Sequence, residues 1–283
     1  MSVLDLLKML WRECLKMKEK EWAFFHSCPE LIGAKLYNRL YRGMSSGRGE
    51  IVFYNQAQKR LYLRVDNSIV VSTDSYYDIL LEIFVNRIYL LPPQLTMKKF
   101  VVFDVGMNRG YASLYFANME NCEHVYGFEL LPSTYEWACE NVSLNSCLQK
   151  KITMFNYGLW NKDDTVNITS DGIDGHTRIA GKDDCRKVEK AQVRKASDVF
   201  AGLLETVGKD MVKVLKIDVE GAEYEVLANL YEQELMEEFD VVIGEYHNGM
   251  EPLMKYMEGF DCVYKNESVL RGIGDMTFVK KRG

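Results

Sequence analysis

The chain has 283 residues, and its composition, 47% hydrophobic and 27% charged, is that of an ordinary globular protein. This length and apolar content are enough to bury a sizeable core, which excludes a disordered chain and a small fold held by disulfides. The 35 Lys and Arg residues are outnumbered by 41 Asp and Glu residues, which gives a net charge of -6. Proteins that grip nucleic acid usually carry a basic excess, so we expect no nucleic-acid partner.

Three features predict a cytoplasmic protein. The seven cysteines form no C-x-x-C pair, which favours free thiols in a reducing compartment. No apolar run reaches the roughly 18 residues of a membrane span. The N-terminal sequence MSVLDLLKMLWRECLKMKEK is interrupted by charges and lacks the apolar stretch and cleavage site of a signal peptide.

Residues 1–74 are expected to form an N-terminal extension that binds substrate, forms an oligomer or covers the site. Apolar residues recur at helical spacing over 3–17, which predicts an amphipathic helix. Its mixed charges favour packing on the protein itself over a membrane surface, and the same helix is the candidate contact of a homodimer. A second helix is expected over 21–42, a Gly/Ser loop over 43–49 and a small antiparallel β-meander over 50–72.

Residues 75–283 are expected to form a second domain, which opens with a helix over 75–91 closed by Pro92-Pro93. From about residue 99, apolar strands alternate with helices. The expected strands are KFVVFDV, HVYGFEL, KITMFNYGL, MVKVLKIDV and FDVVIGEYH, with FDCVYK and DMTFVKK as shorter strands at the end, and the expected helices span 109–119, 133–145 and 221–231. This alternation predicts an α/β fold with a parallel, doubly wound sheet. Such sheets bind ligands at the carboxyl ends of their strands.

The first of these strands ends in a glycine-framed turn, with Asp104 followed by Gly106, Asn108 and Gly110. Glycine lets a ligand approach the backbone, and the helix that follows supplies free N–H groups. The spacing is G-x-x-x-G and not the G-x-G-x-x-G of dinucleotide sites, so a pyrophosphate cradle is weakly supported. An acidic strand end suits a zwitterionic ligand such as S-adenosylmethionine better; the alternative is a plain turn with a solvated Asp104.

The next two strand ends supply further candidate cofactor ligands. Glu129 follows the second strand, where a carboxylate can accept hydrogen bonds from both ribose hydroxyls. The alternative is an exposed glutamate near a helix N-terminus. Phe128 is a candidate cofactor contact or a core residue, and Tyr157, at the end of the third strand, is the candidate for packing on an adenine ring.

The fourth strand carries Lys216, which is unusual because a buried ammonium must be paired. Asp218, Glu220 and Glu223 follow at once, although acidic residues also suit the first turn of a helix. The fifth strand ends in Glu245-Tyr246-His247. Because these strand ends should be neighbours, we expect the lysine, the histidine and the carboxylates to converge there.

The polar stretch 161–195 contains two glycine-rich turns and is long for a loop. One interpretation is a mobile lid in which His176 and Arg178 contact the acceptor. The other is a solvated, irregular insertion.

The residues around these strand ends resemble the FkbM family of S-adenosylmethionine-dependent methyltransferases. The resemblance covers roughly 75–282 and is carried by four segments: DVGMNRGYASLYFA (104–117), GFELLPSTYEWACENVSLN (127–145), VLKIDVEGAEYEVL (214–227) and GEYH (244–247). It implies a class I methyltransferase, Rossmann-like sheet of seven strands, mostly parallel, with the last strand antiparallel. Residues 1–74, the helical and β-meander extension, lie outside it.

The resemblance also implies roles for individual residues. Carried over, the first motif assigns Asp104, Gly106, Asn108 and Gly110 to the cofactor, and the second assigns Glu129 to its ribose. The third motif places Asp218 and Glu220 at the mouth that faces the methyl group. Met107 stands where the family commonly has alanine, which alters the cofactor loop slightly.

Together these features predict an S-adenosylmethionine-dependent methyltransferase that modifies a hydroxyl of a sugar, glycan or natural product. An alcohol needs a general base, and we expect His247 or one of Asp218, Glu220 and Glu245 to take its proton, with Lys216 holding the carboxylates. We expect no metal in this mechanism. An alternative mechanism places a divalent cation on Asp218 and Glu245.

Other functions stay open at this point: an N-methyltransferase of a small molecule or peptide, a nicotinamide-dependent oxidoreductase, and a non-catalytic nucleoside-binding module. The absence of G-x-G-x-x-G argues against the oxidoreductase. A base-flipping amino methyltransferase would carry Asn/Asp-Pro-Pro-aromatic, whereas the only Pro-Pro here is followed by Gln94.

Overall fold

The computed structural model describes residues 49–55, 57–58, 60–66, 68–74, 77–170, 177–179, 188–268 and 272–281. The contacts between Cα atoms divide the chain into two units, Met1–Arg87 and Ile88–Gly283. The helices predicted over 3–17 and 21–42 lie outside the described residues. The substrate-binding, covering or oligomer role expected of residues 1–74 therefore stays a prediction.

The first unit contains the predicted β-meander. Strands β1 (Gly49–Asn55), β2 (Arg60–Val65) and β3 (Ile69–Thr73) pair antiparallel in the order β1-β2-β3. In β2 Leu61, Leu63 and Val65 are buried on one face, whereas on the other face Tyr62 is buried and Arg64 is exposed. Successive side chains of a strand point to opposite faces, so the first of these is the apolar face.

The helix predicted over 75–91 is shorter than expected. Helix α4 (Tyr77–Leu80) continues into a π-helical segment, η2 (Leu81–Asn86), and stops at Arg87, which adopts a left-handed conformation with φ of 56°. The Arg87 N–H bonds back to the carbonyl oxygen of Glu82 and closes the last turn. The predicted stop at Pro92 is therefore wrong, and Pro93 instead begins the short helix α5 (Pro93–Thr96), where its missing N–H costs nothing.

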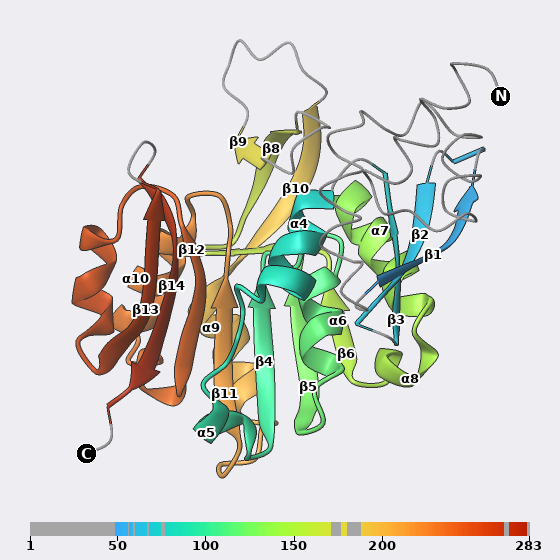
Figure 1. Ribbon diagram of the computed structural model, residues 1–283. Helices are drawn as coiled ribbons and strands as arrows, with labels where there is room; N and C mark the ends of the chain where they lie inside the picture. The colour runs from blue at the N-terminus through green and yellow to red at the C-terminus, as the bar shows by residue number, and fades with distance from the viewer. Residues whose placement is uncertain are drawn as a thin grey trace, which may run out of the picture. The chain divides into compact units, whose positions relative to one another are not determined.

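The second unit is built on a seven-stranded sheet with the order β13-β14-β12-β11-β4-β5-β6 (Figure 1). Its strands are β4 (Phe100–Val105), β5 (Cys122–Phe128), β6 (Ile152–Phe155), β11 (Val212–Ile217), β12 (Val241–Tyr246), β13 (Phe260–Ser268) and β14 (Ile273–Lys280). Neighbouring strands are parallel except for β14, which runs antiparallel to both β12 and β13. The predicted α/β class, with a mostly parallel sheet and an antiparallel last strand, is confirmed.

Helices cover both faces of this sheet. The covering helices include α6 (Tyr111–Ala117), α7 (Pro132–Ser143), α9 (Ala196–Leu204) and α10 (Glu223–Glu232). Strand β4 shows the two faces: Phe103 packs edge-on against Phe200 of α9, whereas the next residue, Asp104, bonds to Ser113 of α6. Because both faces are covered, all six residues of β4 and of β11 are buried, as their apolar runs predict.

The third predicted strand, KITMFNYGL, is two strands in the structure. Strand β6 lies at the edge of the seven-stranded sheet, and β7 (Gly158–Trp160) belongs to a second sheet with the order β7-β10-β8-β9. Asn156 and Tyr157 form the bend between them. The Asn156 side-chain amide donates to the backbone oxygen of Glu129 at 3.0 Å, which ties the bend to the end of β5.

The expectation of an irregular stretch over 161–195 is wrong for much of its described part. Strands β8 (Asp164–Ser170) and β10 (Val188–Lys195) pair antiparallel, and β9 (Thr177–Ile179) pairs with β8. The hydrophobic side that holds these strands comprises Val166, Ile168, Ala191 and Val193, with Leu131. Polar residues alternate with these apolar ones, so the segment is a strand pair with one buried face despite its overall polarity.

The cysteines within the described residues, Cys122, Cys139, Cys147 and Cys262, are all free. Among the described residues, we find no helix with the length and apolar character needed to cross a membrane.

Candidate functional site

The turn after β4 brings the backbone close to the neighbouring strand end. Gly106 and Gly110 have φ of 78°, and Asn108 has φ of 51°, so three residues of one short turn are left-handed. Gly106 is required sterically as well, because a Cβ atom there would lie 1.9 Å from the carbonyl oxygen of Asp218. The turn therefore packs directly on the segment that follows β11.

Replacing Gly106 by alanine should destabilise the fold. The left-handed backbone costs about 1–3 kcal/mol for a residue with a Cβ atom, and the clash with Asp218 adds to this cost. Chemical denaturation measures the loss. Gly202, inside α9, is the matched control, because a Cβ atom added there would meet no other atom within 4 Å; G202A should stabilise by about 0.5–1 kcal/mol. Equal effects of the two substitutions would contradict this account.

Glu129 closes the same turn. Its two carboxylate oxygens accept hydrogen bonds from the backbone N–H groups of Asn108, at 2.9 Å, and Leu131, at 2.8 Å. Burial raises the pKa of Glu129 to about 7, even though these two N–H donors and the nearby charge of Lys216 favour the ionised form. The alternative of an exposed glutamate is excluded, because only 8% of its surface is accessible.

Three predicted cofactor contacts, Asp104, Met107 and Phe128, have their side chains in the protein interior. Phe128 is stacked on Phe155, with ring centroids 5.1 Å apart, and lies in the main hydrophobic core, which was the alternative for this residue. Met107 is also buried. Tyr157 is half-buried against the same core, and the guanidinium of Arg194 lies over its ring, 4.5 Å from the centroid.

Lys216 lies at the centre of a buried polar network. It pairs in register with Asp104 across β11 and β4, and its Nζ lies 3.1 Å from Asp104 Oδ1 and 3.8 Å from Asp218 Oδ2. Nζ also donates to the backbone oxygen of Gly106 at 2.7 Å. Burial lowers the pKa of Lys216, but the two aspartates outweigh it, so the net shift is upward and the lysine keeps its charge. Asp104 is held on its other side by the Ser113 hydroxyl, at 2.6 Å.

Tyr89 is part of this network, and no sequence pattern predicts its place there. Its hydroxyl donates to Asp218 Oδ2 at 3.0 Å, and the Lys216 Nζ lies 5.4 Å from the centroid of its ring. Burial, followed by the charges of Asp218 and Glu245, raises the pKa of Tyr89 well above its usual value, so the hydroxyl stays a donor. Tyr89 and Asp218 are 129 residues apart, which no local pattern connects.

His247 lies at the end of β12 and is held by Glu223. One carboxylate oxygen of Glu223 accepts from the His247 backbone N–H at 2.7 Å and lies 3.0 Å from Nδ1. The other ring nitrogen, Nε2, lies 3.5 Å from Glu220 and 3.7 Å from Glu245. Burial lowers the pKa of His247, but the hydrogen bond and charge of Glu223, with the charges of Asp218 and Glu220, raise it overall to about 9.

Glu223 is one of the acidic residues that follow β11 in the sequence, but no sequence pattern predicts a role for it. It is completely buried at the start of α10, and its other oxygen accepts from the Gly221 N–H at 2.9 Å. Its position in the first turn of a helix offers an ordinary explanation for an acidic residue, which hides its role. The signal that was available is the spacing, because Glu220 and Glu223 flank the tight turn Gly221-Ala222.

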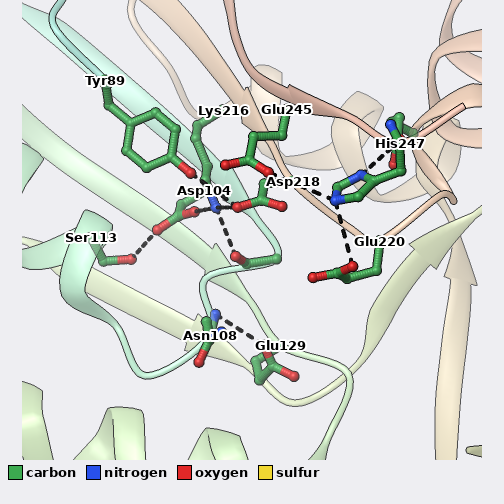
Figure 2. A network of polar contacts seen from close by, with 12 residues as sticks. Tyr89, Asp104, Asn108, Ser113, Glu129, Lys216, Asp218, Glu220, Glu245 and His247 are labelled. Atoms are coloured by element: carbon green, nitrogen blue, oxygen red, sulfur yellow. Dashed lines mark hydrogen bonds and ion pairs between the residues drawn. The ribbon is translucent and has the colours of Figure 1, made fainter. Parts of the chain in front are cut away.

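The structure brings the strand-end residues together in two adjoining groups (Figure 2). Lys216 contacts Tyr89, Asp104 and Asp218, whereas His247 faces Glu220 and Glu245. Asp218 joins the two groups. One carboxylate oxygen of Asp218, one of Glu220 and one imidazole nitrogen of His247 all lie within 4.8 Å of one another. Of the two predicted acceptor contacts, His176 lies outside the described residues, and Arg178 lies in β9, pairing with Thr169 through its backbone.

Comparison with solved structures finds weak likenesses to proteins solved with S-adenosylmethionine. TYW2 of M. jannaschii, solved with AdoMet, is 15% identical, with a TM-score of 0.43, over 82% of this chain and 90% of that one. A putative tRNA (m1A22) methyltransferase of Streptococcus pneumoniae, solved with S-adenosyl-L-methionine, is 14% identical, with a TM-score of 0.38, over 69% of this chain and 75% of that one. These similarities are too low to indicate a shared substrate.

The comparison with family models identifies the family of this chain. No curated protein matches the chain. The model of the methyltransferase FkbM domain, however, matches residues 104–265, which is more than half of the chain and includes the turn after β4, Glu129, Lys216 and the group around His247. The chain therefore belongs to the FkbM methyltransferase family.

Proposed function

We propose that this protein transfers the methyl group of S-adenosylmethionine to a hydroxyl oxygen of a sugar, glycan or natural product. The observation that carries the proposal is the pair formed by Glu129 and the left-handed turn at Gly106–Gly110, beside an acidic group centred on Asp218. Glu129 and the turn are suited to binding a nucleoside, and the carboxylates around Asp218 are suited to removing a proton. Membership of the FkbM methyltransferase family supports the transfer of a methyl group.

The residues at the ends of β4 and β5 fit the cofactor. Glu129 is fixed by two backbone N–H groups and keeps further lone pairs for the two ribose hydroxyls. Gly106 and Gly110 allow the left-handed backbone that brings the turn up to Glu129. When bound, S-adenosylmethionine supplies a methyl group on a sulfonium, which is already activated for transfer.

The acidic group supports a hydroxyl as the acceptor. A neutral amine is already a good nucleophile, whereas an alcohol must lose its proton in the transition state, and a positioned base contributes about 10²–10⁴-fold. His247 Nε2 lies 3.5 Å from Glu220 and 3.7 Å from Glu245. A proton taken by any of these three groups is therefore shared with a neighbour. Tyr89 and Lys216 hold Asp218 in its place beside them.

A two-step experiment tests the proposal. Saturating S-adenosylmethionine should raise the melting temperature of the protein, because a ligand at 100 times its Kd stabilises by about 2.7 kcal/mol, whereas NADH should leave it unchanged. Pools of glycosides, hydroxylated natural products, amines and short RNAs are then incubated with the cofactor and analysed by mass spectrometry. A methylated hydroxyl supports the proposal. Methylation confined to amines or RNA, or stabilisation by NADH alone, would overturn it.

The affinity for S-adenosylmethionine should fall as the pH is lowered through about 7. The Glu129 carboxylate accepts hydrogen bonds best when ionised, and burial, opposed by the N–H groups of Asn108 and Leu131 and by Lys216 and reinforced by Asp104, raises its pKa to about 7. One unit below that pKa, the apparent affinity should drop about tenfold. Calorimetry from pH 5.5 to 8.5 measures it. The Glu129→Gln variant should bind weakly at every pH; an equal pH dependence in both proteins would rule Glu129 out.

A further inference from the structure

Two carboxylates and one imidazole meet beside the proposed methyl-transfer site. The carboxylates of Asp218 and Glu220 and the imidazole of His247 each place one ligand atom within 4.8 Å of the other two. Asp218 and Glu220 keep 25% and 30% of their side-chain surface exposed, so an ion from solvent can reach them. The His247 side chain is 11% exposed, so it lies deeper in the protein than the two carboxylates.

The orientation of His247 is that of a metal ligand. Its Nδ1 lies 3.0 Å from the buried carboxylate of Glu223, which also accepts the backbone N–H of the same residue, so the ring cannot swing away. Nε2 is thereby directed toward Glu220. Histidines that bind metals almost always donate their second ring N–H to a carboxylate or carbonyl in this way, which fixes the tautomer and raises the basicity of the ligating nitrogen.

The surrounding charge also favours a cation. Lys216 is engaged by Asp104 and by the Gly106 carbonyl, and lies 3.8 Å from Asp218. Around the imidazole stand Glu220, Glu223 and Glu245, whose carboxylate oxygens lie within 3.7 Å of its ring nitrogens. Carboxylates gathered in this way attract a positive ion to the space that their oxygens and Nε2 share.

We propose that Asp218, Glu220 and His247 bind a divalent transition-metal cation of the Mn²⁺ class, with Glu223 positioning the histidine. A set of two carboxylates and one imidazole suits such a cation better than Mg²⁺ or Ca²⁺, which prefer oxygen ligands alone. This ligand set differs from the pair Asp218 and Glu245 that the sequence offered. Glu245 remains outside it, 3.7 Å from Nε2.

The role of this cation rests on the proposed function, although its binding does not. The cation lowers the pKa of an acceptor hydroxyl held at the site. The O–H bond breaks and its proton passes to the Glu245 carboxylate. The oxygen forms a bond to the methyl carbon, and the carbon–sulfur bond breaks with its electron pair left on sulfur, which turns the sulfonium into a neutral thioether.

A Mn²⁺ titration of the metal-stripped full chain tests the binding, with free Mn²⁺ measured by electron paramagnetic resonance. Wild-type protein should bind one ion, and Glu220→Gln should weaken the binding at least about tenfold. Glu225→Gln is the matched control, because Glu225 lies in the first turn of α10, close to Glu220 in the sequence but outside the ligand set, and it should bind as wild type does. Glu223→Gln should weaken binding about 10–100-fold through the ring that it orients.

The outcomes separate this proposal from the proposed function. Equal Mn²⁺ affinity in wild type and Glu220→Gln, or no binding at all, overturns the metal site, and calorimetry with S-adenosylmethionine on the same samples then shows whether the cofactor site stands. Mn²⁺ binding without cofactor binding overturns the proposed function instead. Retained cofactor affinity in Glu220→Gln also shows that this variant is folded, so its loss of Mn²⁺ is a local effect.

Discussion

Replacing His247 by glutamine should collapse turnover, by about 10²–10⁴-fold in kcat, while the Kd for S-adenosylmethionine stays within about twofold. The imidazole faces Glu220 and Glu245 through Nε2, and glutamine offers neither its basicity nor its second nitrogen bonded to Glu223. The residues that we propose to bind the nucleoside lie at the ends of β4 and β5, whereas His247 lies at the end of β12. Single-turnover methyl transfer measures the rate, and calorimetry measures the affinity.

His124 provides the control for this substitution. It lies on β5, is half-buried, and hydrogen-bonds through its ring to the Thr153 hydroxyl at 2.8 Å. His124→Gln should therefore leave kcat within about twofold of wild type. Unchanged turnover in His247→Gln would remove His247 from the chemistry, and a large loss of cofactor affinity would show instead that the substitution disturbs the whole strand edge.

Replacing Lys216 by methionine should lower the free energy of unfolding by about 3–5 kcal/mol at neutral pH. Methionine retains the length of the side chain but not its charge, so Asp104 is left fully buried, without its cationic partner and held only by Ser113. The second partner, Asp218, loses part of its anchorage as well. Urea denaturation followed by circular dichroism measures the change, which is a large fraction of the 5–15 kcal/mol typical of a whole domain.

Lys213 lies on the same strand and tests whether any lysine of β11 has this effect. It is buried along its stem, but its Nζ lies 3.6 Å from Glu238, which is half-exposed. Such a pair is worth about 0–1 kcal/mol, so Lys213→Met should cost no more than that. If the two variants unfold at the same urea concentration, then the buried ion pair is not what stabilises the centre of the sheet.

The central strands of the sheet and the polar residues at their ends could be predicted, because each stands out from the sequence around it. Asp104 and Lys216 interrupt apolar runs, and a charge in a buried strand must find a partner in the neighbouring strand. The register of β11 and β4 places Lys216 beside Asp104, a residue that the family resemblance assigns to the cofactor instead. Glu129 was found in the same way, from the chemistry of a strand end.

The parts that could not be predicted depend on contacts distant in the sequence or on competing explanations. Tyr89 reaches Asp218 from a segment before the first parallel strand, and no periodicity links them. Glu223 looks like an ordinary first-turn glutamate until His247 is seen to bond to it. Over 161–195, frequent Asp, Thr and Lys residues masked the alternation of Val166 and Ile168, which decides that β8 is a strand.

The hydrogen bond from Tyr89 to Asp218 also bears on how this protein can be shortened. The matched family region begins at Asp104, yet a chain cut there would leave Asp218 without its phenolic donor. Such a chain also lacks residues 100–103 of β4, the strand that pairs with both β11 and β5, so it should lose the centre of the sheet together with this hydrogen bond. A shortened protein that keeps both features has to begin upstream of the tyrosine.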